Sequence, residues 1–151
     1  MAADNPYLLD TNVVLLATRQ HSAAAKVIDA QVGLSTTRFR PAISEVSVGE
    51  LYAFTLSQKW GEKRKALLNE QIERCLVIPI AHPGIYLRWA EMASALRERG
   101  SPIGQNDLWI AATASITALT LLTTDRDFSS LVATHQLDAV MLDPNTGIEY
   151  P

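Results

Sequence analysis

The stretch Tyr7-Leu8-Leu9-Asp10-Thr11-Asn12-Val13-Val14-Leu15 places three polar residues in the middle of an apolar run. Tyr7 to Leu9 is typical of a central strand that is buried on both faces. Asp10 stands where that strand should give way to a helix, and open parallel sheets bind their ligands at this end of their strands. Asp10, Thr11 or Asn12 could equally cap the helix that follows, because all three residue types are good N-caps. Whether Asp10 belongs to a ligand site or only caps a helix therefore depends on which other residues are expected near it.

Strand-like and helix-like segments alternate along the whole chain, which indicates an α/β domain with about five mainly parallel strands flanked by helices. We expect residues 1–151 to form a single domain. The expected strands are Tyr7 to Leu9, Pro41 to Ser44, Leu76 to Ile80, Leu119 to Thr123 and Ala139 to Leu142. The expected helices are Val13 to Thr18, His21 to Val32, Val46 to Ser57, Glu62 to Cys75, Pro83 to Arg99, Asn106 to Ala118 and Phe128 to Ala133. The expected loops are Leu34 to Phe39 and Ser101 to Gln105, and an irregular tail begins at about Asp143.

Composition fits an ordinary globular protein, with 48% hydrophobic and 19% charged residues. No run approaches the roughly 20 apolar residues that span a bilayer, and no basic region followed by an apolar stretch marks a signal peptide. We therefore expect a cytoplasmic protein with no membrane partner. The single cysteine, Cys75, excludes an internal disulfide and a cysteine metal cage. The net charge of −3 does not suggest a general nucleic-acid binder, although carboxylates reserved for cations would make any chain look acidic.

One carboxylate lies on an apolar helical face. Glu50 shares the inward face of its predicted helix with Val46, Ala53 and Phe54. A carboxylate should not be buried there without a partner. Glu50 is therefore a candidate site residue, although it could also face water.

Further carboxylates stand next to strand ends or helix starts. Asp107 heads a helix whose next residues are almost wholly apolar. Asp125 and Asp127 directly follow the fourth strand, at the same sheet edge that presents Asp10. Taken singly, Asp107 could serve the helix dipole and Asp125 could cap a turn. Together with Glu50, however, these segments bring carboxylates to one place.

Like charges gathered that closely are costly unless they are protonated or matched by cations. A cluster that offers only oxygen ligands favours Mg²⁺ or Mn²⁺ over zinc. The three histidines, His21, His82 and His135, are scattered along the chain and are expected to be surface residues.

The candidate acids lie in four sequence blocks that extend over nearly the whole chain. The blocks are Leu8-Leu9-Asp10-Thr11-Asn12, Ile43-Ser44-Glu45-Val46-Ser47-Val48-Gly49-Glu50-Leu51, Asn106-Asp107-Leu108-Trp109-Ile110-Ala111-Ala112-Thr113-Ala114 and Leu122-Thr123-Thr124-Asp125-Arg126-Asp127-Phe128. In sequence and in order, these blocks resemble the PIN-domain family, in particular the VapC toxins of bacterial toxin–antitoxin systems.

The resemblance implies a Rossmann-like sheet and a Mg²⁺-dependent ribonuclease that acts on RNA as a homodimer. It also implies inhibition by a small antitoxin protein bound over the active-site groove. The acids of the family map here to Asp10, Glu50, Asp107 and Asp125, with Asp127 close by. The polar positions that support those acids map to Thr11, Asn12 and Thr124.

Hydrolysis of a phosphodiester needs a nucleophile, neutralisation of the phosphate and stabilisation of the leaving oxygen, and bound Mg²⁺ can supply all three. We expect Asp10 and Asp107 to be the main ligands, while Glu50 and Asp125 bind directly or through water and one of them orients the attacking water. Mn²⁺ should substitute. RNA would approach through basic residues at the rim of the site. The candidates are Arg19, Arg38, Arg40 and Arg126.

Other functions fit less well. A haloacid-dehalogenase-type phosphatase needs a second acid two residues after Asp10, where Asn12 stands, and a later lysine, whereas no lysine follows Lys65. A phosphoacceptor receiver domain fails on the same missing lysine. Dinucleotide binding lacks a Gly-x-Gly-x-x-Gly turn. A catalytically inactive RNA-binding or regulatory module of the same fold remains an alternative.

Overall fold

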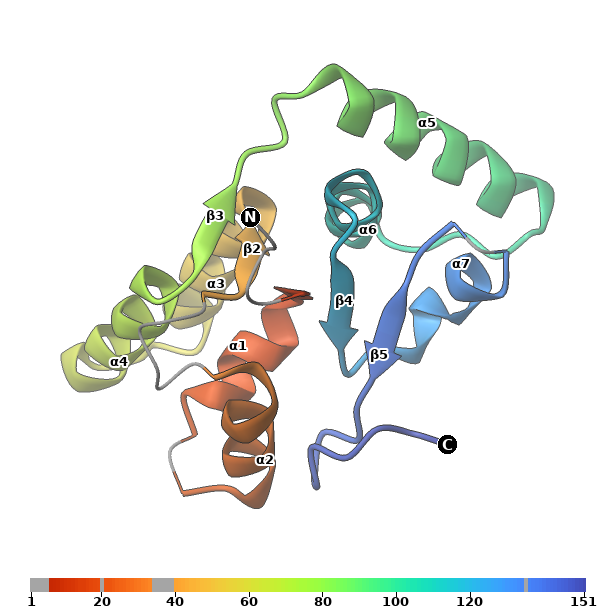
Figure 1. Cartoon of the computed structure of the whole chain (residues 1–151). Helices are drawn as coiled ribbons and strands as arrows, with labels where there is room; N and C mark the ends of the chain where they lie inside the picture. Colours follow the sequence, from red (N-terminus) through yellow and green to blue (C-terminus); the bar gives the residue numbers. More distant parts are fainter. Residues whose placement is uncertain (1–5, 20, 34–39, 135) are drawn as a thin grey trace.

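The computed structural model describes residues 6–19, 21–33, 40–134 and 136–151. Its centre is a five-stranded sheet in the order β3-β2-β1-β4-β5, in which every neighbouring pair is parallel (Figure 1). The strands are β1 Tyr7–Leu9, β2 Ala42–Ser44, β3 Leu76–Ile78, β4 Thr120–Thr123 and β5 Ala139–Met141. This sheet confirms the predicted α/β class, and its strands are wholly rather than mainly parallel.

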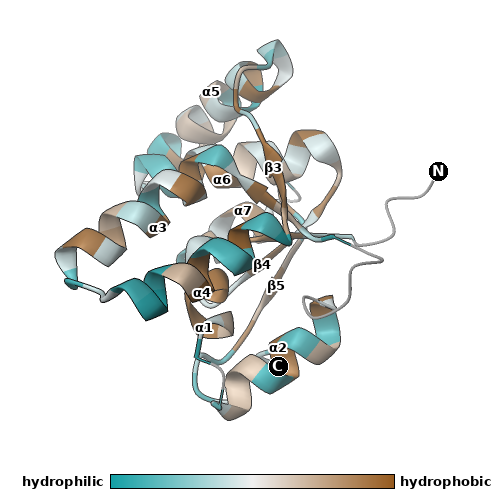
Figure 2. Cartoon of the chain, turned by 90° about the vertical axis from the view of Figure 1, so that its left-hand side faces the viewer, coloured by the Kyte–Doolittle hydropathy of each residue, from teal (hydrophilic) through white to brown (hydrophobic). Residues whose placement is uncertain are grey.

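Helices cover both faces of the sheet because alternate residues of each strand point to opposite sides. Leu8 packs into a core with α5, α6 and α7, whereas Leu9 packs into a second core with α1, α2 and α4. The strands β1, β2 and β4 are thus mostly buried, whereas the edge strand β3 leaves Leu76 and Val77 exposed. On the surface, α4 presents mostly hydrophilic residues (Figure 2). The helices are α1 Thr11–Ala17, α2 Ala23–Val32, α3 Glu45–Ser57, α4 Glu62–Glu73, α5 Pro83–Glu98, α6 Gln105–Thr117 and α7 Ser129–Ala133, with the short 3-10 helix η1 Arg126–Phe128.

The sheet order reverses direction at its centre. From β1 the chain first builds β2 and β3 on one side, and it then crosses to build β4 and β5 on the other. In such sheets the carboxyl ends of the strands on either side of the reversal leave a crevice between their loops, and ligands bind there. The loops after β1 and β4 carry Asp10 and Asp125.

Side-chain caps fix where the helices begin. The Asp10 carboxylate accepts from the amide of Thr11 and so caps α1. Ser22 caps α2 by accepting from the amide of Ala25, so this helix begins at Ala23 rather than at His21. The predicted loop 34–39 lies outside the described residues.

The predicted inward face of α3 is wrong. Ala53 and Phe54 are exposed, and the buried residues of the helix are Ser47, Leu51 and Thr55. Hydroxyl groups can be buried when they find hydrogen-bond partners. Thr55 Oγ1 donates to the Tyr52 carbonyl one turn back, and Ser47 Oγ is within hydrogen-bond distance, 3.1 Å, of the Thr11 hydroxyl on α1. Hydropathy alone therefore assigned the aromatic side of α3 to the interior, although that side is exposed.

The segment from Asp143 has no helix or strand, as predicted, but it is tied to the domain. Glu149 forms an antiparallel bridge with Leu142. At Gly147, φ is +72°, and an added Cβ would lie 2.9 Å from the carbonyl oxygen of Ala24 on α2. Only glycine fits such a backbone and such a close approach. Separately, no helix within the described ranges is long and apolar enough to cross a bilayer.

Candidate active site

The four predicted acids all stand at or near the carboxyl edge of the sheet. Asp10 follows β1, and Asp125 follows β4 after one intervening residue. Glu50 lies on α3, which starts directly after β2. Asp107 lies in the first turn of α6, and α6 leads back to the amino end of β4, so its first turn is at the opposite, carboxyl edge.

Asp10 is almost fully buried, with 3% of its surface exposed, and both of its oxygens are bound. Oδ1 accepts from the Thr11 amide at 2.8 Å, and Oδ2 accepts from the Thr123 hydroxyl at 2.6 Å. The Asp10 amide also donates to the carbonyl of Leu122 at 2.9 Å, which extends the pairing of β1 with β4. An ionised carboxylate has about four lone-pair sites, so each oxygen of Asp10 can still accept one more ligand.

The Thr11 side chain connects Asp10 to α3. Its hydroxyl lies 2.7 Å from Glu50 Oε1, to which it donates, and 3.1 Å from the Ser47 hydroxyl. The other oxygen of Glu50 accepts from the Asn106 amide nitrogen at 3.2 Å, at the start of α6. Glu50 thus bridges α1 and α6 from α3.

Asp125 is joined to the same network through Thr123. The backbone amide of Asp125 donates to Thr123 Oγ1 at 2.9 Å. Asp125 Oδ1 accepts from the Asp127 amide at 2.8 Å and caps η1. Asp127 itself is exposed. Thr123 therefore holds both the Asp10 carboxylate and the turn that carries Asp125.

Asp107 is held differently, because no hydrogen bond from the described residues reaches its carboxylate. A Cβ added at Gly104 would lie 3.3 Å from Asp107 Oδ2, so the carboxylate turns back over the residue that precedes α6.

The acids are close enough to affect one another's ionisation. Burial raises the pKa of Asp10 to about 6, against the hydrogen bonds from Thr123 and Thr11, and the charges of Glu50 and Asp125 raise it further. Burial also raises the pKa of Asp107 to about 6, and four nearby carboxylates add to this effect. In order of size, these belong to Asp10, Asp125, Glu50 and Asp127.

The donor set fits a hard divalent cation that keeps part of its water shell. Within the described part of the chain, no three histidine, cysteine, aspartate or glutamate side chains are spaced to hold a metal ion as they stand. Mg²⁺ does not need such a cage, because it usually binds through one or two carboxylates and retains several waters. The neighbouring carboxylates, which add to the effect of burial on the pKa values of Asp10 and Asp107, would be neutralised by such an ion.

The supporting residues differ in part from the predicted ones. Thr11 contacts the acids, whereas Asn12 is exposed, and Thr124 makes no hydrogen bond with any described side chain. The neighbouring Thr123 makes the hydrogen bonds to the Asp10 carboxylate and to the Asp125 amide. It follows Leu122 just as Asp10 follows Leu9, and Leu9 pairs with Leu122, so the register of β1 against β4 was the signal that could have identified it.

The predicted basic rim is scattered. Arg40 precedes β2 and so lies at the amino edge of the sheet, opposite the acids. Arg126 lies between Asp125 and Asp127, with its guanidinium 4.8 Å from the centre of the Tyr150 ring. Arg19 lines a cavity beyond α1. Arg38 lies outside the described residues.

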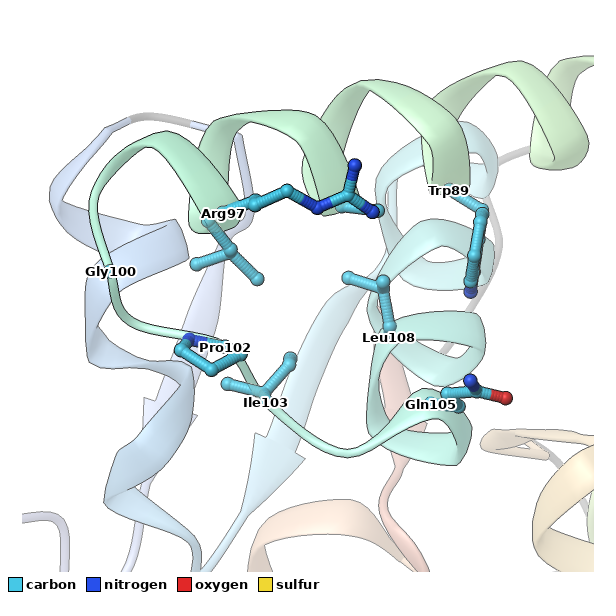
Figure 3. A pocket seen from close by; sticks show the side chains of 9 residues that line it. Trp89, Arg97, Gly100, Pro102, Ile103, Gln105 and Leu108 are labelled. Carbon is cyan, nitrogen blue, oxygen red and sulfur yellow. The ribbon is translucent and has the colours of Figure 1, made fainter.

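A cavity of about 440 Å³ lies on the other side of the first turn of α6, between α5 and residues 100–104. Figure 3 shows Trp89 and Arg97 extending from α5 towards it, with Gln105 and Leu108 on the α6 side. No acidic side chain lines it, so it is separate from the acid cluster.

Residues 7–133 match the PIN domain, and the chain therefore belongs to the PIN-domain family. Within that family, it is 30% identical over 124 residues to ribonuclease VapC5 of Mycobacterium tuberculosis, covering 82% of this chain and 86% of that protein. It is 28% identical over 131 residues to ribonuclease VapC1 of Haemophilus influenzae strain R2866, covering 83% and 91%. The crystal structure of VapBC2 from Rickettsia felis, bound to a promoter DNA fragment, matches with a TM-score of 0.75 and 25% identity, over 88% of this chain and 96% of that one. The predicted resemblance to VapC ribonucleases is confirmed.

Proposed function

We propose that this protein is a Mg²⁺-dependent endoribonuclease that hydrolyses RNA phosphodiester bonds and acts as the toxin of a toxin–antitoxin pair. The curated relatives are named ribonucleases, and they match over more than four-fifths of this chain. Mn²⁺ is expected to substitute for Mg²⁺, because both prefer oxygen ligands. Such an enzyme would act in the cytoplasm, where its RNA substrate is.

The observation that carries the proposal is a continuous hydrogen-bond network that ties carboxylates from separate segments to the sheet's carboxyl edge. Holding several carboxylates together costs electrostatic repulsion. A purely structural role gives no reason for that cost, whereas a cation site requires the carboxylates to be close together. In order along the network, its members are Asp127, Asp125, Thr123, Asp10, Thr11, Glu50 and Asn106.

In this proposal Asp10 and Asp107 hold the ion, and Glu50 and Asp125 act directly or through water. A bound Mg²⁺ supplies neutralisation of the scissile phosphate and a water of lowered pKa. The carboxylate of Glu50 or Asp125 orients the attacking water. Thr123 keeps Asp10 ionised by donating a hydrogen bond to the charged form.

We also propose a small antitoxin protein and a second copy of the chain as partners. Large apolar side chains on α3 and α5 remain exposed, which is typical of surfaces that meet other proteins. They include Tyr52, Leu56, Tyr86 and Leu87, of which Leu56 is 71% exposed. Light scattering of the purified protein tests the dimer. Co-expression with candidate antitoxins tests the complex, which should suppress cleavage.

The decisive experiment incubates purified protein with Mg²⁺ and a mixed pool of cellular RNA and maps the new ends. Cleavage at defined positions is expected. Excess EDTA should abolish it, and added Mg²⁺ or Mn²⁺ should restore it. The Asp107→Asn protein, purified in the same way, controls for contaminating nuclease. Full activity in excess chelator would exclude a metal-dependent nuclease, and no cleavage of any RNA in the pool would favour the inactive binding module.

A further inference from the structure

Two helices lead away from the acid cluster side by side. Both α1 and α3 follow neighbouring parallel strands, and the Thr11–Glu50 hydrogen bond joins them at the site. Residues four apart lie on the same side of a helix. The residues four and eight positions after Thr11 and Glu50 therefore lie on the same sides of α1 and α3 as these two. Beyond Thr11 these positions are Leu15 in α1 and Arg19, which lies just past the end of α1. Beyond Glu50 they are Phe54 in α3 and Gln58, its C-cap.

Those positions line one cavity of about 170 Å³. Its far wall is formed by Trp60, which precedes α4, and by Arg64 in the first turn of α4. Gln58, the C-cap of α3, is eight residues beyond Glu50. Eight residues of helix rise by about 12 Å, so the end of the cavity that carries Gln58 is roughly that far from Glu50. The same two helices therefore carry the Thr11–Glu50 pair at one end and line the cavity at the other.

The guanidinium of Arg64 is held by stacking. Its central carbon lies 3.8 Å from the centre of the Trp60 ring. That ring is itself fixed, because Trp60 is buried and meets Phe54 edge to face at 5.7 Å. A stacked guanidinium keeps its in-plane N–H groups free, and their fork matches the oxygens of a phosphate.

The two charged side chains that line this cavity, Arg19 and Arg64, are both positive. Among the described residues, ion pairs join Lys65 to Glu62 and Arg88 to Glu91, and neither Arg19 nor Arg64 takes part in one. No acidic side chain lines the cavity. Two arginines that face one polar hollow without an acid between them fit an anion.

We propose that this cavity binds a backbone phosphate of single-stranded RNA that lies along α1 and α3, with Arg19 and Arg64 as its ligands. The inference rests on the proposed ribonuclease activity and adds a subsite to it. A phosphate is favoured over an acidic peptide because the same two helices carry both the acid cluster and the cavity. One strand can thus place one phosphate at each, and the arginine subsite then sets which bond lies at the acids.

The subsite holds substrate and takes no part in bond cleavage, so its loss should raise KM and leave kcat unchanged. We expect the double variant Arg19→Ala/Arg64→Ala to raise KM roughly tenfold, in keeping with lost charge-assisted hydrogen bonds. Losing one phosphate contact should also reduce the slope of log affinity against log salt by about 0.7. The slope is measured by fluorescence anisotropy of a short labelled oligoribonucleotide of mixed sequence, in an Asp107→Asn background that prevents cleavage.

The matched control is Lys63→Ala, which removes one positive charge from the exposed neighbour of Arg64 on the same helix but outside the cavity. It should leave KM and the salt slope near those of the unmodified protein. Arg64→Lys keeps the charge and loses the fork, so an intermediate KM is expected. Arg19→Ala alters an exposed residue beyond α1 and reports on the subsite even if changes at Arg64 loosen the packing on Trp60.

Each outcome separates the two proposals. If the unmodified protein cleaves RNA and the arginine variants keep its KM and salt slope, the subsite is excluded and the ribonuclease stands. The same holds if those variants lose only their affinity for a co-expressed acidic partner protein, because the cavity would then be a protein-docking site. If the unmodified protein cleaves no RNA, the anisotropy measurement still tests the subsite, and equal RNA affinity of the arginine and Lys63 variants overturns it.

Discussion

Asp10 and Asp107 carry the same carboxyl group with the same raised pKa of about 6, but two different regions of the molecule hold them. At the junction of β1 and β4, Asp10 is buried and both of its oxygens accept hydrogen bonds from Thr11 and Thr123. At the start of α6, Asp107 is half-buried, and no described residue donates to its carboxylate. The sheet half of the site is therefore built in advance, whereas the helix half has freedom to adjust its position to a ligand.

The largest effect is expected for Asp107→Asn, which changes the helix half of the site and leaves the sheet half intact. The substitution keeps the shape and removes one repelling charge, so cleavage should be lost while the metal-free protein becomes more stable by about 1 kcal/mol. The gain in stability is small because solvent screens the repulsion at a half-exposed carboxylate. The melting temperature should rise by about 2–4 °C, and the extra stability that Mg²⁺ gives should shrink. Thermal melts with and without Mg²⁺ measure both. Unchanged melts in both conditions would remove Asp107 from the site.

The next effect tests the link between the two regions, which runs through Glu50. Glu50→Gln should reduce turnover at least about tenfold, because it neutralises a carboxylate that orients water. Glu45→Gln is the matched control: Glu45 lies on the same helix but is exposed, and its carboxylate accepts from the Ile80 amide, away from the acids. Initial rates on one cleaved RNA measure the difference. A large loss in the Glu45 variant with none in the Glu50 variant would contradict the arrangement.

Removing the donor that fixes Asp10 tests the preformed half. Thr123→Val keeps the size of the side chain but leaves Asp10 Oδ2 without its hydrogen bond. Loss of a residue that orients a metal ligand typically costs about tenfold to a hundredfold in activity, and an effect near the lower figure is expected. Thr124→Val, at the neighbouring position, should have little effect. Equal losses in both variants, measured as kcat/KM, would show that Asp10 does not depend on this hydroxyl.

The smallest effect is a dependence of metal-free stability on pH. Between about pH 4 and pH 6 the folded protein binds more protons than the unfolded chain, because the folded pKa values of Asp10 and Asp107 exceed the ordinary value of 3.8. Their contribution to the free energy of unfolding therefore falls as the pH rises through this window. Denaturant melts in EDTA at several pH values should show a smaller fall for Asp107→Asn, and an identical fall would mean that Asp107 keeps an ordinary pKa.

The acids could be predicted because each interrupts or borders an apolar segment, and parallel strands present their carboxyl ends at one edge. Their supports were harder to identify. Choosing Thr123 over Thr124 requires the pairing of Leu9 with Leu122, and a pairing between strands so far apart in the sequence is not visible in either one.

The orientation of α3 failed for a different reason. Hydropathy assigns aromatic residues to the inside, but this helix buries Ser47 and Thr55 and leaves Phe54 at the wall of a cavity. The Thr55 hydroxyl bonds within its own helix, and the Ser47 hydroxyl meets Thr11 on α1. Tertiary partners decide such cases, and no local pattern contains them. Arg19 was among the predicted rim residues, but Arg64 was not, because the two arginines come to one cavity only once α1 and α4 are packed.

The hydrogen bond between Asp10 and Thr123 also has a consequence for the time at which the protein becomes active. Its two residues are 113 positions apart, and a ribosome adds roughly 5–20 residues per second, so the second follows the first by roughly 6–23 seconds. During that interval β1 has no β4 beside it, and Asp10 lacks both its buried position and its donor. A nascent chain that has not yet reached β4 therefore has no complete site, and translation that stops before β4 leaves Asp10 without the hydroxyl that holds it.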